Sequence, residues 1–243
     1  LPPIIHNELV VRDRLSSMSM NGATILLNRV FNNSNLKNLG MEGNPSEFGI
    51  YLSLIKSNNL HIKKGDEYVI SIENTKNKSI KTIYDEFLKL IKGSKEAINV
   101  SDIYAHFVKQ PYGIKIGLLP ILIGIFFKAT EASCAFYNKD EQGRESLITE
   151  FDQKIAERLY HMPETLKIMF VKIEGEKQII LDEFKSYVEK NFLNNQPIEN
   201  PTPLYVLKPI VVKAYKLPSY SRKTRNFKDQ RVLVLRDELL STQ

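Results

Sequence analysis

The side chains of this sequence that could do chemistry are a single cysteine, four histidines and numerous carboxylates. A zinc site needs closely spaced histidines or cysteines, as in a zinc-binding helix or a zinc finger. The histidines are instead remote from one another in sequence: His6, His61, His106 and His161. Folding could still gather them, but without cysteine partners the sequence predicts no metal site and no other cofactor.

Cys134 lies in an apolar string, residues 132–137, and has two interpretations. It is either a small buried hydrophobic side chain, which we expect, or a reactive thiol. Because it is the only cysteine, no internal disulfide can form, and a secreted domain of this size would more often contain paired cysteines. The sequence therefore favours a cytoplasmic location.

Adjacent carboxylates recur along the chain, and a separated pair could supply a general acid and a general base. The pairs are Asp85-Glu86, Asp140-Glu141, Asp182-Glu183 and Asp237-Glu238. They fall where helices or turns should face solvent, so nothing marks one pair as functional. A hydrolase nucleophile elbow is missing, and Gly93-Ser94-Lys95 lacks the preceding glycine of a phosphate-binding loop. We expect no catalytic centre, so that this chain is not an enzyme by itself.

The most informative feature is a basic stretch from Lys208 to Arg231, in which Asp229 is the one opposing carboxylate. Three aromatic residues lie among its charges: Tyr215, Tyr220 and Phe227. This composition is suited to contacting phosphates while stacking on bases. The residues expected to bind nucleic acid here are Lys213, Lys216, Arg222, Lys223, Arg225 and Lys228. A formal net charge of +6 also favours an acidic partner.

The basic stretch has a second interpretation. Residues 218–221 could form an ordinary loop whose cations pair with acidic groups on other domains of a larger protein. Lys63 and Lys64 on a first expected hairpin would add phosphate contacts, and so would Lys139 and Arg144 on a second. Lysines at such hairpins are also common as simple solubility residues, so both interpretations stay open.

Hydrophobic spacing and turn signals predict an α+β, helix-rich fold with tandem winged-helix-like units. Helices are expected at residues 20–31 and 79–92, and Asn44-Pro45 should start another between them. Two short strands should flank the turn at residues 63–66. Because helix, helix and hairpin is the order of a winged helix, we expect residues 1–95 to form a first winged-helix-like unit.

A similar order follows, so residues 96–193 are expected to form a second winged-helix-like unit whose wing lies at residues 139–144. The apolar helix that ends near Thr130 should be core. A helix at residues 179–192 should direct four residues inward: Ile180, Phe184, Tyr187 and Val188. Residues 194–243 should hold a linker, short strands at 205–207 and 210–212, the basic stretch and a last helix at 229–240.

The chain begins without methionine or a signal peptide, and we expect it to be a fragment of a longer protein. Its most apolar run, residues 116–127, falls short of the roughly 20 residues that cross a bilayer, so a membrane partner is not expected.

Three stretches of the sequence resemble a known family. They are LGMEGNPSE at residues 39–47 with Leu60-His61 downstream, PYGIKIGLLP at residues 111–120, and LPSYSRKT at residues 217–224. Their order is similar to the region after the motor in very large bacterial P-loop ATPases of phage-defence loci of the BREX kind. The resemblance implies a winged-helix-bearing segment that helps a large ATPase engage DNA or partner subunits. No nucleotide-binding motif of that family maps onto this chain.

Three functional hypotheses follow. The leading one is a non-catalytic accessory domain of a large ATP-dependent phage-defence protein, which contacts nucleic acid without base specificity. The alternative is a protein–protein interaction or regulatory module that binds other domains or subunits of the assembly and no nucleic acid. The third, an enzyme of another class, requires a deep pocket with convergent polar groups.

Overall fold

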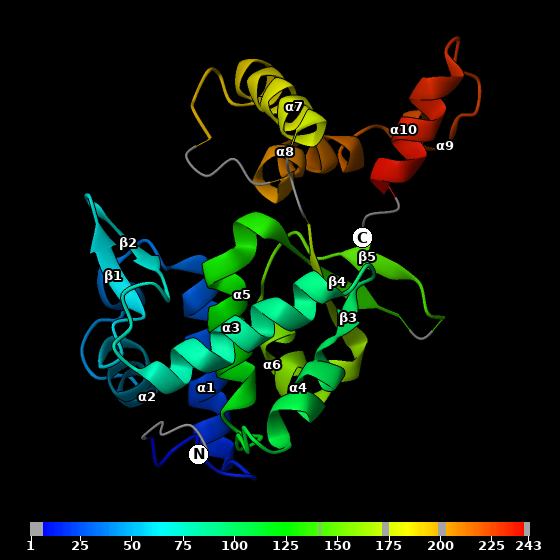
Figure 1. Ribbon diagram of the computed structural model, residues 1–243. Coiled ribbons are helices and arrows are strands. Elements are labelled where there is room, and N and C mark those ends of the chain that lie inside the picture. Colours follow the sequence, from blue (N-terminus) through cyan, green and yellow to red (C-terminus); the bar gives the residue numbers. More distant parts are fainter. Residues whose placement is uncertain (1–6, 141, 172–174, 199–202, 241–243) are drawn as a thin grey trace. The chain divides into compact units, whose positions relative to one another are not determined.

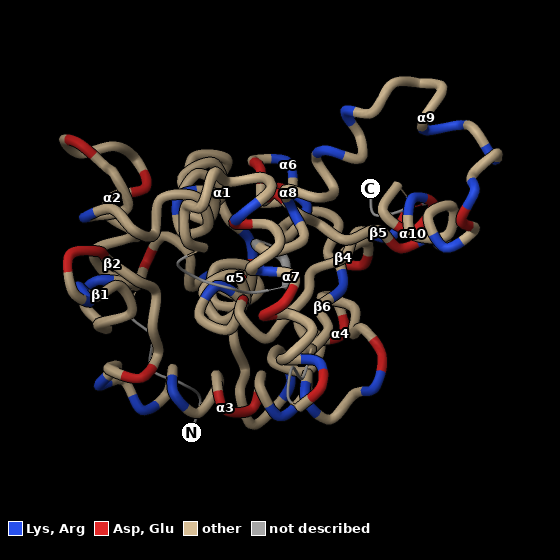
Figure 2. Tube along the Cα trace, turned by 90° about the horizontal axis from the view of Figure 1, so that it is seen from above, with Lys and Arg blue, Asp and Glu red and all other residues tan. Residues whose placement is uncertain are grey.

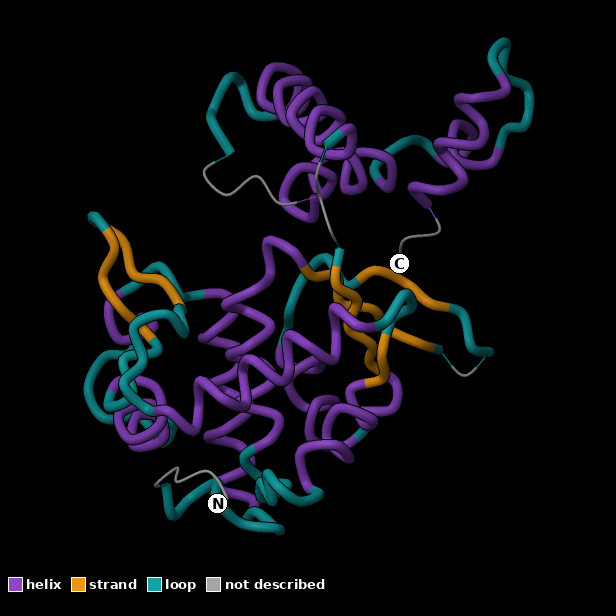
Figure 3. Tube along the Cα trace, in the orientation of Figure 1, coloured by secondary structure: helices purple, strands orange, loops and turns teal. Residues whose placement is uncertain are grey.

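The computed structural model describes residues 7–140, 142–171, 175–198 and 203–240. The chain is α+β and helix-rich, as the sequence predicts, with short strands in two small sheets (Figure 3). It divides into two compact units, namely unit 1 (residues 1–130 and 150–170) and unit 2 (residues 131–149 and 171–243). The expected division at residues 95 and 193 stays a prediction. Within the described ranges no helix is long and apolar enough to cross a membrane.

Unit 1 is mainly helical (Figure 1). Its helices are α1 (Ser17–Asn32), η1 (Lys37–Gly40), α2 (Phe48–Ile50), η2 (Tyr51–Lys56), α3 (Lys78–Gly93), α4 (Val100–Val108), α5 (Leu119–Thr130), α6 (Gln153–His161) and η4 (Pro163–Thr165). Its strands are β1 (His61–Lys64), β2 (Glu67–Ile70), β3 (Ile98–Asn99) and β6 (Leu166–Phe170). β1 pairs with β2 and β3 pairs with β6, both antiparallel.

Helix α5 is the centre of the core in unit 1. It is apolar on all sides, and its residues from Leu119 to Phe127 are buried, which confirms the expected core helix. α1 packs against both α5 and α6. Gly124 permits the close approach of α1, because a Cβ at this position would collide with the side chain of Leu27. Phe126 makes aromatic contacts with Tyr84 and Phe87 of α3, at 5.3 and 5.7 Å between ring centroids.

Local signals set most of these elements, with small corrections at their ends. Asn77 caps α3 by accepting from the N–H groups of Ser79 and Ile80, so the helix begins at Lys78, one residue before the expected start at residue 79. The expected helix start at Asn44 is wrong, because the regular turn begins at Phe48 and continues as the π-helix η2. The first expected hairpin is confirmed, with Gly65 at a φ of 65° in its turn.

Unit 2 combines a hairpin with a helical part. Its elements are η3 (Glu131–Ser133), β4 (Cys134–Lys139), β5 (Glu145–Leu147), α7 (Glu176–Phe192), α8 (Pro203–Tyr215), α9 (Ser219–Lys223) and α10 (Gln230–Leu240). β4 and β5 pair in antiparallel fashion, as expected for the second hairpin, and α10 confirms the expected last helix. A small apolar cluster of Leu181, Val188 and Val206 joins α7 to α8.

Two predictions for unit 2 are wrong. The strands expected at residues 205–207 and 210–212 are parts of helix α8, in which Val206, Val211 and Ala214 are buried. β-branched residues favour strands locally, but packing of α8 against α7 overrides that preference.

The second error concerns the buried face of α7. Of the four residues expected inward, only Val188 is buried. Ile180, Phe184 and Tyr187 are 52%, 40% and 55% exposed. α7 turns its Leu181 and Val188 face toward α8 and leaves a neighbouring apolar face uncovered.

Candidate nucleic-acid interface

The basic segment, defined here as residues 213–228, contains six basic residues and no acidic residue. It runs from the end of α8 through α9 to the start of α10, and Figure 2 shows its lysines and arginines in blue. All six expected contact residues of this segment are exposed: Lys213, Lys216, Arg222, Lys223, Arg225 and Lys228. The six cations thus follow one another along an exposed stretch of the chain.

A hydrogen bond connects the beginning of the basic segment to α10. The Tyr215 hydroxyl donates a hydrogen bond to the carbonyl oxygen of Leu240 at 2.5 Å, which joins the end of α8 to the end of α10. Burial raises the pKa of the Tyr215 hydroxyl, so this donor stays protonated near neutral pH. This hydrogen bond therefore ties the last residue of α10 back to the last residue of α8, across the intervening stretch that carries most of the basic segment.

Arg236 of α10 holds the middle of the basic segment through hydrogen bonds to its backbone. It is buried on α10, and its Nη1 donates to the carbonyl oxygens of Ser221, at 3.3 Å, and Thr224. Its Nε and Nη2 donate to Asp237 Oδ1 at 3.0 and 2.6 Å, and its guanidinium lies 5.2 Å from the ring centre of Phe227. A buried guanidinium with bonded donors is a structural group, so Arg236 shapes the segment instead of contacting a ligand.

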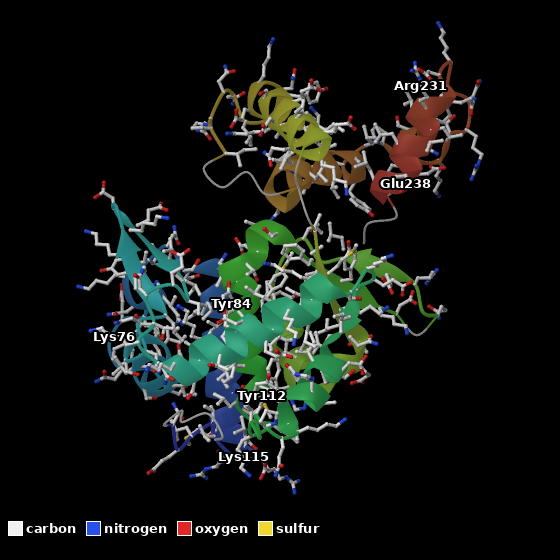
Figure 4. All side chains as sticks on the ribbon, viewed as in Figure 1. Lys76, Tyr84, Tyr112, Lys115, Arg231 and Glu238 are labelled. Carbon is white, nitrogen blue, oxygen red and sulfur yellow. The ribbon has the colours of Figure 1, made fainter. Side chains whose placement is uncertain are left out.

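The carboxylate nearest to the basic segment in sequence is already paired. Asp229 accepts hydrogen bonds from Arg231, from Nε at 3.1 Å, from Nη2 at 2.7 Å and from the backbone N–H at 2.9 Å. These bonds hold the pKa of Asp229 below its ordinary value. Arg231 and Glu238 lie near opposite ends of α10 (Figure 4).

The six cations of the basic segment differ in the contacts that their side chains make. Lys213 Nζ lies 4.7 Å from the ring centre of Phe192, a cation–π contact that holds this side chain against α7. No described carboxylate forms an ion pair with the other five: Lys216, Arg222, Lys223, Arg225 and Lys228. These five charges are the ones available to phosphates.

The lysines of the first hairpin belong to unit 1 and are also exposed. Lys63 and Lys64 lie at the end of β1, opposite Tyr68 and Glu67 of β2. An opposite charge directly across an antiparallel pair attracts the lysine. Lys64 therefore has a carboxylate directly across the hairpin, whereas Lys63 does not.

The second hairpin offers less than the sequence suggested. Arg144 donates to Asp140 through Nε at 2.7 Å, and the same carboxylate accepts from the Arg144 backbone N–H at 2.8 Å. The Arg144 side chain is the main cause that lowers the pKa of Asp140. This arginine serves the turn of the hairpin.

Among the described residues, those considered for catalysis or metal binding form no cluster that could hold a metal ion. His6 and Glu141 lie outside the described residues. Cys134 is buried in β4, as expected. No described group of three or more histidine, cysteine, aspartate or glutamate residues could hold a metal ion. The paired carboxylates within the described residues are half-buried or exposed, which agrees with solvated positions.

His61 and His106 have structural surroundings. His61 is buried, with Nδ1 3.0 Å from the Tyr51 hydroxyl and Nε2 2.9 Å from the carbonyl oxygen of Ser34. Burial lowers the pKa of His61. His106 is partly buried, and its Nε2 lies 3.3 Å from Glu86 Oε1.

The sequence patterns did not reveal two features of unit 2, the burial of Arg236 and the exposed apolar face of α7. Arg236 sits among exposed neighbours on α10 and carries no sequence signal that separates it from the basic stretch. The uncovered apolar face of α7 matches an ordinary core pattern. Both become visible only when burial is known.

No protein-family model, no characterised protein and no solved structure matches this chain significantly.

Proposed function

We propose that this chain is a non-catalytic accessory domain of a large ATP-dependent phage-defence protein, and that it contacts nucleic acid without base specificity. The observation that carries the nucleic-acid part is the basic segment, in which six exposed cations occur without one acidic residue. Lysine and arginine side chains that neutralise phosphates release condensed counterions, which drives binding regardless of sequence. The ATPase context rests on the resemblance of residues 39–47, 111–120 and 217–224.

A winged-helix arrangement of residues 1–95 and of residues 96–193 belongs to this proposal. In unit 1 the order α1, α2 with η2, and then the β1–β2 hairpin supports it. The wing would place Lys63 and Lys64 near phosphates. Base readout by α2 and η2 is not part of the proposal, because Lys56 is the only basic residue of these two elements and a recognition helix needs a polar, exposed face.

The test is the salt dependence of binding to labelled DNA by the full chain. Substituting Arg222, Lys223 and Arg225 together by alanine should weaken binding by about tenfold or more. Each lost phosphate contact should lower the slope of log affinity against log salt by about 0.7 to 0.9. Permuting the DNA sequence should leave the affinity unchanged.

A matched control removes three charges elsewhere. Lys76, Lys78 and Lys81 are exposed residues at and before the start of α3, and their replacement by alanine alters net charge equally. This control should keep both the affinity and the salt slope. Binding that does not respond to salt, no binding at all, or equal losses in both variants would refute the proposal.

The second candidate function is a protein–protein interaction module, and one observation favours it. Ile180, Phe184 and Tyr187 share one face of α7 through their i, i+4 and i+7 spacing, and they are between 40% and 55% exposed. Contiguous apolar surface of this kind marks interaction sites. The partner would be another domain or subunit of the ATPase assembly. This candidate requires that the wild-type chain bind no DNA, and that Ile180→Ser together with Tyr187→Ser abolish binding to that assembly.

A further inference from the structure

The three aromatic residues of the basic segment have different surroundings. Tyr215 is half-buried, and its hydroxyl is committed to Leu240. Phe227 is half-buried and lies beneath the guanidinium of Arg236. Tyr220 is 77% exposed, the most exposed aromatic side chain among the described residues. Only Tyr220 has a ring free to meet a ligand.

The charged residues nearest to Tyr220 in sequence are all basic. It lies on α9 together with Arg222 and Lys223, and Lys216 precedes the same turn. These three cations are exposed and no described carboxylate pairs with them. An aromatic ring between cations can accept a base on its face while phosphates on either side meet the charges.

The backbone that carries Tyr220 is held in place. Its carbonyl oxygen accepts from the Thr224 N–H at 2.8 Å, and the Arg222 N–H donates to the Pro218 carbonyl oxygen at 3.1 Å. Arg236 also donates hydrogen bonds to the backbone carbonyl oxygens of Ser221 and Thr224. A ring on a fixed backbone loses less entropy when it binds, so the site is partly organised in advance.

We infer that Tyr220 stacks on an unpaired base, so that the basic segment binds single-stranded nucleic acid in preference to duplex. This inference rests on the proposed function and specifies its ligand. In a duplex both faces of each internal base are covered by neighbouring bases, so the ring has no face to stack on. A single strand presents free base faces, and one stacked base contributes about 1 to 3 kcal/mol.

The experiment compares two labelled probes by fluorescence anisotropy with the full chain: an oligothymidylate of about 16 nucleotides and a duplex of equal length. Tyr220→Ala should weaken oligothymidylate binding by about 5- to 100-fold. Duplex affinity and the salt slope should stay unchanged, because the cations remain. Tyr220→Phe should retain binding, since stacking uses the ring and not the hydroxyl.

Tyr187→Ala is the matched control, because Tyr187 is 55% exposed on α7, outside the basic segment. It should bind oligothymidylate like the wild-type chain, and circular dichroism should show the same helix content in all variants. If Tyr220→Ala binds oligothymidylate as tightly as the wild type, or weakens both probes equally, the inference is wrong while the proposed function stands. If the wild-type chain binds neither probe, the proposed function fails and this inference with it.

Discussion

Helices α5 and α7 show how differently the two units use apolar side chains. In unit 1, nine successive residues of α5 are buried, from Leu119 to Phe127. In unit 2, α7 is longer, at 17 residues, yet buries only Leu181 and Val188. Burial of apolar surface is the main favourable contribution to folding, so α5 stabilises its unit far more than α7 does.

Exposed apolar residues occur in both units, but α7 and α10 of unit 2 each carry several of them. On α10, Val232, Val234 and Leu235 are between 47% and 60% exposed, in addition to the uncovered face of α7. The helical part of unit 2 also carries the basic segment. Unit 1 thus has the larger buried core, although single apolar side chains such as Met18 and Ile116 are exposed on it. In unit 2, exposed apolar side chains recur along α7 and α10, and the same unit carries the basic segment.

The largest expected effect tests the core of unit 1. Phe126 is fully buried between Tyr84 and Phe87, so Phe126→Ala should lower the free energy of unfolding by about 3 to 5 kcal/mol. Urea denaturation followed by circular dichroism measures this change. Phe184→Ala on α7 removes the same side chain from a site that is 40% exposed and should cost clearly less. Equal losses in the two variants would erase the contrast between the units.

The next effect concerns the hydrogen bonds that buried Arg236 donates to the backbone of the basic segment in unit 2. Arg236→Leu removes the donors that bind Ser221 and Thr224, and should destabilise the basic segment locally by about 2 kcal/mol. Hydrogen–deuterium exchange should then speed up at the amides of residues 219–225. Arg231→Leu is the control, since its side chain is 91% exposed, and it should leave exchange there unchanged. Unaltered protection in Arg236→Leu would mean that the segment is held by other contacts.

A smaller effect depends on pH and tests a buried polar residue of unit 1. The pKa of His61 is lowered by burial, so the unfolded chain takes up a proton near the ordinary value of 6.5 and the folded chain only at lower pH. Stability contributed by neutral His61 is therefore present above about pH 6.5 and is lost as the pH falls.

The measurement is the free energy of unfolding between about pH 7.5 and 5. His61→Gln should flatten this dependence, whereas substitution of the exposed His161 by glutamine should not. If the wild-type chain and His61→Gln had the same profile, the buried histidine would contribute nothing to the pH dependence of the free energy of unfolding.

The smallest effect is expected on the uncovered face of α7. Ile180→Ala should change the free energy of unfolding by no more than about 0.5 kcal/mol, because the side chain is 52% exposed. Val188→Ala, on the same helix but fully buried, should cost about 1 to 3 kcal/mol. Thermal and urea denaturation of the two variants measure the difference. A larger loss for Ile180→Ala would assign this face to the folded core.

Much of the fold was predictable because its signals are local. The helical pattern of α3 and the turn at Gly65 each depend on residues within a few positions of one another. The helix-rich α+β class follows from such signals. So does the candidate interface, because a run of six cations without an acidic residue is visible in the sequence itself.

The tertiary structure decided what the local signals left open. Residues 205–212 are rich in β-branched side chains, and their packing against α7 made them helix α8. α7 has two apolar faces of similar composition, and the position of α8 determined which of them is buried. The structure also buried Arg236 and left Arg222 and Tyr220 exposed, although all three lie close together in sequence. Burial depends on what distant residues place over a side chain, and the sequence of a short segment does not contain that information.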